Sequence, residues 1–276
     1  MGLLDALARI LTALGIRTDV ATFLAWYGLA FARVTSAIAL APFLGGGAVP
    51  ARVKAGLGAV ITAILFMHVT PPESSRAISP LFFAALLVKE AMIGLTIGIL
   101  AQFVFYAVQM AGSLIDTQRG MSQMTFFAPQ LPGNVSSLGQ LKFQAALVLF
   151  VTIDGHLLFI RALGDSFRPL PLMEFPKFQA GFVASAEQAA RLSADALLIA
   201  MQLAAPALLA LFLVDVAAGA VGKVASQINV HNESQPVKSL AGLAVLLLAI
   251  ALIMTQLRGR LEQMLLQIQN FLRGMA

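Results

Sequence analysis

The chain has no cysteine, one tryptophan and few charged residues. Without cysteine, it cannot form disulfides, thiolate metal sites or a cysteine nucleophile. Only 11% of its 276 residues are charged and 59% are hydrophobic, whereas roughly 25% of a soluble domain is charged. Such high hydrophobicity also excludes a disordered chain. The composition predicts a protein surrounded by lipid or by other apolar helices.

Positive charge is spread along the sequence. It contains 18 Lys and Arg residues and 13 Asp and Glu residues, a net charge of +5. The basic residues do not form the clusters typical of nucleic-acid binding, so we expect no nucleic-acid partner. Basic residues favour the cytoplasmic side of a membrane, and their distribution among the expected loops favours cytoplasmic termini.

Six apolar regions approach the ~20 residues that a helix needs to cross a bilayer. They predict an all-α membrane protein with about six long, partly broken hydrophobic helices that form hairpins, in one membrane-associated helical domain over residues 1–276. Before them, Leu3–Ile16 has the spacing of an interfacial amphipathic helix. The six regions are Phe23–Leu44, Ala55–Val69, Leu81–Met110, Phe143–Leu163, Ala194–Ala220 and Leu240–Leu257.

Ionisable side chains interrupt these regions. Each costs at least ~2.5–3.5 kcal/mol at the bilayer centre, so we interpret them as polar contacts between helices or subunits. A secondary transporter with ion or proton sites at Glu90, Asp154 and Asp215 is the alternative, but the two halves lack the similarity expected of inverted repeats. The residues that we assign to polar contacts are Arg33, Lys89, Glu90, Asp116, Gln118, Asp154, His156 and Lys238.

Gly94 and Gly98 lie about one helical turn apart in the region Leu81–Met110. Small residues at this spacing let a second helix approach closely, so we expect close helix packing there. A chance pair in a glycine-rich membrane chain is the alternative. A helix over the whole region would be about 45 Å long, against a hydrocarbon core of ~30 Å. We therefore expect it to tilt, bend or extend beyond the lipid.

A run of Met and Phe residues follows a polar turn within a plug-type loop that we predict over residues 112–142. Flexible thioethers and aromatic rings fill irregular space and can repack, which suits a gate. Non-helical backbone at membrane depth must be buried in protein or line a cavity. An apolar loop packed on its own helices is the alternative. The candidate gate residues are Gly120, Met121, Met124, Phe126, Phe127 and Pro129.

The sequence offers little basis for catalysis. Asp154 and His156 form a single Asp-Gly-His turn, which supplies neither a metal ligand set nor an oriented nucleophile. Ser166 paired with His156 would lack a glycine elbow and an orienting acid. The triple glycine Gly45–Gly47 is not followed by the Gly-Lys-Ser/Thr of a phosphate-binding loop. We predict no enzyme activity, no catalytic or metal-binding residues and no cofactor.

The C-terminal stretch over residues 256–276 carries apolar residues at three- and four-residue spacings. This pattern predicts an amphipathic helix end suited to an interface or a partner, with a solvated tail as the alternative. The apolar positions are Leu257, Leu261, Leu265 and Ile268, with Arg258, Arg260 and Gln263 between them.

Several different short motifs follow one another along most of the chain. They are Arg33 with Pro42-Phe43, Val49-Pro50 with Arg52-Val53-Lys54, Lys89-Glu90 with Gly94 and Gly98, Asp116 with Gln118-Arg119-Gly120, Phe150 with Asp154-Gly155-His156, Ser166-Phe167 with Pro169, and Gln227 with Asn229-Val230 and Gln235-Pro236. In this order and spacing they resemble the FliR/SctT family, the export-gate membrane proteins of flagellar and virulence type III secretion systems.

Three positions bear on the branch and on local contacts. Ala128-Pro129 stands where the family commonly has Asp-Pro, and Asn229-Val230-His231 where it commonly has Asn-Val-Phe. Pro236-Val237-Lys238-Ser239 looks more like the injectisome branch, SctT, than the flagellar branch, FliR. We therefore favour a virulence secretion system.

The resemblance implies a structural and gating subunit in the bacterial inner membrane, within the basal body of the secretion system. Such subunits assemble with FliP/SctR-type and FliQ/SctS-type proteins into a closed helical cone that begins the protein-conducting channel for unfolded substrates. Their apolar surface faces these partners as well as membrane lipid. An FlhB/SctU-type switch protein would lie near Pro236–Ser239. The family's plug loop maps onto Gly120–Pro129, so Met121, Met124, Phe126 and Phe127 would help to seal the resting pore.

Overall fold

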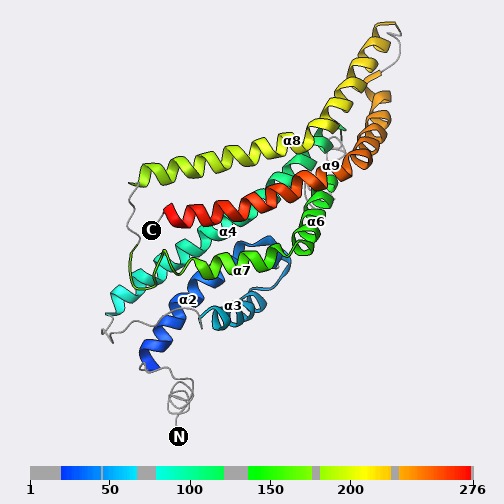
Figure 1. Ribbon diagram of the computed structural model, residues 1–276. Coiled ribbons are helices and arrows are strands. Elements are labelled where there is room, and N and C mark those ends of the chain that lie inside the picture. Colours follow the sequence, from blue (N-terminus) through cyan, green and yellow to red (C-terminus); the bar gives the residue numbers. More distant parts are fainter. Residues whose placement is uncertain are drawn as a thin grey trace. The chain divides into compact units, whose positions relative to one another are not determined.

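The computed structural model describes residues 20–44, 46–66, 79–120, 136–175, 181–224 and 230–274, and all secondary structure in these ranges is helical (Figure 1). The predicted all-α class is therefore confirmed. The elements are α2 (Val20–Leu40), η1 (Pro42–Leu44), η2 (Gly46–Ala48), α3 (Ala51–Phe66), α4 (Pro80–Gln118), α6 (Ser137–Thr152), α7 (Gly155–Asp165), α8 (Gly181–Val224) and α9 (Val230–Gly274).

The chain divides into two compact units, and both are discontinuous in sequence. Unit 1 comprises Met1–Gln102, His156–Val183 and Leu265–Ala276, and unit 2 comprises Phe103–Gly155 and Ala184–Met264. Helix α4 passes from one unit to the other, so its first half packs within unit 1 and its last turns within unit 2.

Three described helices are long and apolar enough to cross a membrane: α2, α4 and the part of α8 over Ala194–Val224. The pair α6 and α7 would add a fourth span, broken by a bend of 72°. Helix α3 covers only part of the expected span Ala55–Val69 and is not among these candidates, since its 16 residues extend about 24 Å at 1.5 Å per residue; residues 67–69 lie outside the described residues. The expected span Leu240–Leu257 lies in α9, where several side chains fall outside the described set.

The break between α6 and α7 lies at Asp154 and Gly155. Asp154 has φ +57°, a left-handed conformation that Asp tolerates better than most residues. Gly155 follows it, and a Cβ there would collide with the ring of Phe150. The predicted region Phe143–Leu163 is therefore two helices joined by a sharp turn.

Aromatic contacts organise the described core of unit 1 at the α2–α3 hairpin. The ring of Phe66 in α3 packs edge-on against Phe23, Trp26 and Tyr27 of α2. The Tyr27 hydroxyl also donates to the Ala59 carbonyl at 2.8 Å. These contacts fix the short helix α3 on α2.

Several stretches that we expected to be loops are helical. Residues 112–118 continue α4 and 137–142 begin α6, so the segment between these helices is shorter than the predicted range 112–142. Helix α9 includes Pro236, so residues Pro236–Ser239, near which the resemblance places the switch protein, are helical. The predicted helix Leu3–Ile16 is not among the described residues.

Candidate functional site

A buried ion cluster connects α2 to α4 in unit 1. Arg33 Nε donates to Oε2 of Glu90, and the Lys89 Nζ lies 2.6 Å from Oε1 of Glu90. The side chains of Arg33 and Glu90 are fully buried and that of Lys89 is almost so. Charges at this depth persist only when they are paired and hydrogen-bonded. The structure thus brings together three residues that interrupt the first and third apolar regions.

Arg33 extends its other nitrogens toward the backbone after α7. Nη1 donates to the carbonyl and hydroxyl oxygens of Ser166 at 3.0 and 3.2 Å, and Nη2 donates to the Leu170 carbonyl at 2.7 Å. The guanidinium also lies over the ring of Phe167, 4.4 Å from its centroid. A planar group with five donors can serve all these partners at once, which a lysine cannot.

Lys89 holds the continuation of the same segment. Its Nζ donates to the carbonyl oxygens of Pro171, Leu172 and Glu174 at 2.8–2.9 Å. Buried backbone outside helices must find its hydrogen-bond partners within the protein. Arg33 and Lys89 supply those bonds, so the two cations fix residues 166–174 against α2 and α4.

Close packing of α2 on α4 accompanies this cluster. A Cβ at Gly94 would collide with the Arg33 carbonyl and the Ser36 hydroxyl, and a Cβ at Gly98 would lie 2.8 Å from the Ala37 carbonyl. Both glycines are therefore points where the α2 backbone approaches α4. This approach is what lets Arg33 reach Glu90.

A second polar cluster lies in unit 2, where α4 ends and α6 begins. Asp116 Oδ2 accepts from the Ser136 hydroxyl at 2.6 Å and from the Leu138 N–H at 2.9 Å. Arg119 Nη1 donates to Asp116 Oδ1 at 3.2 Å, and its Nη2 donates to Ser239 Oγ of α9 at 2.9 Å. Ser136 also caps α6 by accepting from the Gly139 N–H. One carboxylate thus connects both ends of the segment over residues 121–135 and is linked to α9.

The neighbouring contacts connect the end of α4 to the α8–α9 hairpin. Lys238 of α9 forms an ion pair with Asp215 of α8, and Gln118 Nε2 donates to Asp215 Oδ2 at 3.2 Å. Gly120 has φ +77°, and a Cβ there would collide with the Gln235 amide of α9. Residues Asp116–Gly120 are therefore fixed on α9 immediately before the predicted plug.

Asp154 and His156 do not belong to these clusters. Asp154 is exposed at the break between α6 and α7. His156 is half-buried, and its Nδ1 has no hydrogen-bond partner among the described residues. Nowhere among the residues that the structure describes does a group of three or more His, Asp or Glu side chains lie where it could hold a metal. The predicted gate residues Met121, Met124, Phe126, Phe127 and Pro129 are not among those described.

Several polar groups of these units were not predicted from the sequence. The backbone carbonyls of residues 166–174 carry no sequence signal. Ser136 and Ser239 are ordinary helix-start and helix-face residues, although Ser136 could have been found as an N-cap. Lys142 is buried, and among the described residues its Nζ has no hydrogen-bond partner. A single lysine near a helix start gave no reason to expect that.

Comparison with known proteins identifies the family. The family model for bacterial export proteins, family 1, matches residues 24–264. The chain belongs to this family. It is 31% identical over 238 residues to the flagellar biosynthetic protein FliR of Pectobacterium carotovorum subsp. carotovorum, which covers 85% of this chain and 88% of the relative. It is 30% identical to FliR of Escherichia coli K12 over 81% of the chain and 85% of the relative.

Injectisome proteins are also among the relatives. The Yop proteins translocation protein T of Yersinia pestis is 33% identical over 166 residues, 59% of this chain and 60% of the relative. The resemblance to FliR/SctT is therefore confirmed. The chain is a non-enzymatic component of the type III export gate in the bacterial inner membrane, and its partners are other parts of the export apparatus. The preference for the injectisome branch finds no support here, because the flagellar relatives align over more of the chain.

Proposed function

We propose that this subunit assembles with FliP/SctR-type and FliQ/SctS-type proteins and forms part of the protein-conducting channel for unfolded substrates. Large apolar side chains remain exposed along helices with candidate spans, among them Leu209, Phe212 and Leu213 of α8. Lipid and partner helices are the two surroundings that accept such surfaces. The buried charges of Arg33, Lys89 and Glu90 are meanwhile paired with one another within the chain.

The segment that begins at Gly120 acts in this proposal as the plug of the resting channel. The observation that carries it is the double role of Asp116, which binds Ser136 and Leu138 after the segment and Arg119 before it. A plug must be able to move while its two ends stay attached to the protein. The hydrogen bonds of Asp116 attach both ends of this segment. Met121, Met124, Phe126 and Phe127 would then fill the pore, as the composition of the run suggests.

The secretion branch remains a separate proposal. Pro236-Val237-Lys238-Ser239 favours an injectisome, whereas the coverage of the relatives favours a flagellar system. Complementation decides between them. The gene is introduced into one strain that lacks its FliR-type protein and into another that lacks its SctT-type protein, and it should restore secretion in only one of the two. An FlhB/SctU-type switch protein near the start of α9 belongs to the same proposal and is tested by cross-linking from Val237, an exposed residue of that helix.

Co-expression tests the assembly. The tagged chain is produced with the two small membrane proteins of its own secretion system and purified in mild detergent, and the product is analysed by native mass spectrometry. We expect one large complex that contains all three proteins. A stable species of this chain alone, indifferent to the partners, would contradict the proposal and favour a self-sufficient transporter.

A further inference from the structure

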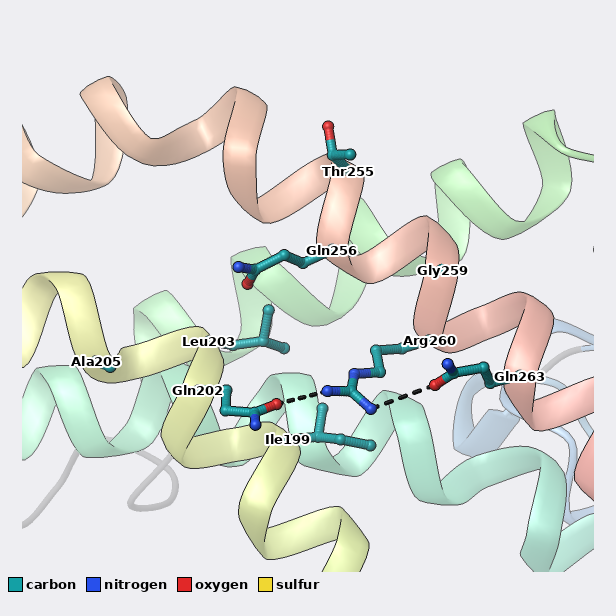
Figure 2. A pocket seen from close by; sticks show the side chains of 9 residues that line it. All are labelled: Ile199, Gln202, Leu203, Ala205, Thr255, Gln256, Gly259, Arg260 and Gln263. Atoms are coloured by element: carbon teal, nitrogen blue, oxygen red, sulfur yellow. Dashed lines mark hydrogen bonds between the residues drawn. The ribbon is translucent and has the colours of Figure 1, made fainter.

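A groove with a mixed polar and apolar lining lies between α8 and α9 in unit 2. It encloses about 610 Å³, and Figure 2 shows the Arg260 guanidinium between the amides of Gln202 and Gln263. Gly259 is an open position, because nothing lies within 4 Å of a Cβ placed there. The lining residues are Ile199, Gln202, Leu203, Ala205, Thr255, Gln256, Gly259, Arg260 and Gln263.

The charge of Arg260 is not neutralised within the described part of unit 2. Its Nη2 donates to Gln202 Oε1 at 2.6 Å and its Nη1 donates to Gln263 Oε1 at 3.2 Å, and both acceptors are neutral. No carboxylate of a described residue forms an ion pair with Arg260. Arg258, two residues earlier in α9, is already paired with Glu262 and does not line the groove. The groove therefore holds a positive charge that no described carboxylate neutralises, whereas the paired charge of Arg258 lies outside it.

The hydrogen-bonding groups that remain in the groove are mostly donors. Of the five N–H donors of an arginine, Arg260 uses two in these bonds. The same bonds occupy the amide oxygens of Gln202 and Gln263 and leave their NH₂ groups available. Donors and positive charge together fit an anionic group. The apolar floor of Ile199 and Leu203 fits the side chains that flank such a group on a helix.

We infer that this groove docks an acidic side chain on a helix of a partner subunit of the export apparatus. The inference rests on the proposed assembly, and it adds Arg260 as a contact residue and a carboxylate as the partner group that Arg260 binds. Gln202 lies within the candidate span Ala194–Val224, where polar groups are costly unless protein or water surrounds them. A partner carboxylate would neutralise Arg260, and its helix would cover the three amides. A phospholipid phosphate is the competing source of the same charge.

Two pairs of matched variants test the docking. Arg260→Gln removes the charge from the groove, and Arg258→Gln removes a charge that is already paired outside it. Gly259→Leu fills the groove, whereas Gly219→Leu makes the same change at another open helix position. Each full-length variant is co-expressed with the other subunits. Partner retention, anionic phospholipid retention and thermal stability are measured in detergent.

We expect Arg260→Gln to lower partner retention about thirtyfold or more, because breaking a buried interfacial charge pair costs at least about 2 kcal/mol. We expect Gly259→Leu to lower it as well, because its side chain occupies the groove, while both control variants assemble like the wild type. Photo-cross-linking from position 205 should then locate a partner Asp or Glu, and its change to Arg should restore assembly of an Arg260→Glu variant.

Three results would overturn the inference. Normal assembly of both groove variants would exclude a docking role. Loss of bound phospholipid with intact partner retention would assign the groove to a lipid headgroup. Equal loss of partners from all four variants, with the wild type intact, would show that the effect is not specific to the groove. If the wild type itself retained no partner subunit, the proposed function would fail as well.

Discussion

Asp116 accepts a hydrogen bond from the hydroxyl of Ser136 at 2.6 Å, twenty residues further along the chain. Asp116 lies near the end of α4, and Ser136 caps α6. Their contact places both ends of the intervening segment at one buried carboxylate. The same carboxylate also binds Arg119, which binds Ser239 of α9, so the residues on either side of the predicted plug are connected to α9.

The first prediction concerns these contacts of Asp116. Ser136→Ala should cost about 1 kcal/mol of stability through loss of the helix cap alone, and Asp116→Ala should cost more because it leaves Arg119 without its carboxylate. A double-mutant cycle should give a coupling of about 0.5–3 kcal/mol, measured by thermal unfolding in detergent. Thr117→Ala, next to Asp116 but exposed, is the control. Strict additivity of the two changes would contradict a coupling between the two residues.

The second prediction concerns the ion cluster of unit 1. Arg33→Gln or Glu90→Gln alone should destabilise the chain by about 3–5 kcal/mol, because each leaves a buried charge without its partner. The double change should cost less than the sum. Protein abundance in membranes and the unfolding midpoint measure both effects. If Glu90→Gln left folding and assembly intact but abolished secretion, Glu90 would be a functional proton site and the structural interpretation would be wrong.

A third prediction concerns the approach of α2 to α4. Gly94→Ala should destabilise by about 1–3 kcal/mol, since its Cβ would collide with the Arg33 carbonyl and overpacking carries that cost. Gly56→Ala in α3 is the matched control, because its Cβ meets nothing within 4 Å. In a helix it should be neutral or stabilise by up to about 1 kcal/mol. Equal midpoints for the two variants would show that Gly94 is not a packing position.

The ion pair of Lys238 and Asp215 gives a fourth prediction. Lys238→Glu should reduce secretion and protein abundance, since it places two carboxylates together at the α8–α9 hairpin. The double change Lys238→Glu with Asp215→Lys should recover part of both. Lys223→Glu, at an exposed position near the end of α8, should behave like the wild type. Failure of the double variant to recover anything would mean that the pair acts through something other than mutual attraction.

Sequence reasoning gave the class of fold and the positions of most helices, because hydrophobicity over ~20 residues is a strong signal in membrane proteins. It also selected Arg33, Lys89 and Glu90, since charges in apolar regions need partners. It did not give the partners. The two cations bind the backbone carbonyls of residues 166–174, and a carbonyl is the same at every residue.

Helix boundaries and local breaks were harder to predict. Residues 112–118 and 137–142 were expected in a loop because they are polar, but polar residues extend helices wherever tertiary contacts such as those of Asp116 hold them. The predicted region Phe143–Leu163 is interrupted at Asp154, which a hydropathy pattern does not detect. The pairing of Arg260 with Gln202, 58 residues apart, is likewise a tertiary contact without a local signal.

Leakage through the assembled gate tests the central claim most directly. The chain without Met121–Phe127 is overexpressed with its two small partners, and the entry of a small solute that the membrane normally excludes is measured. The wild-type gate, expressed at the same level, is the control. We predict that the deletion makes membranes leaky while the three-protein complex still forms. An assembled complex with unchanged leakage would show that this segment does not close the pore.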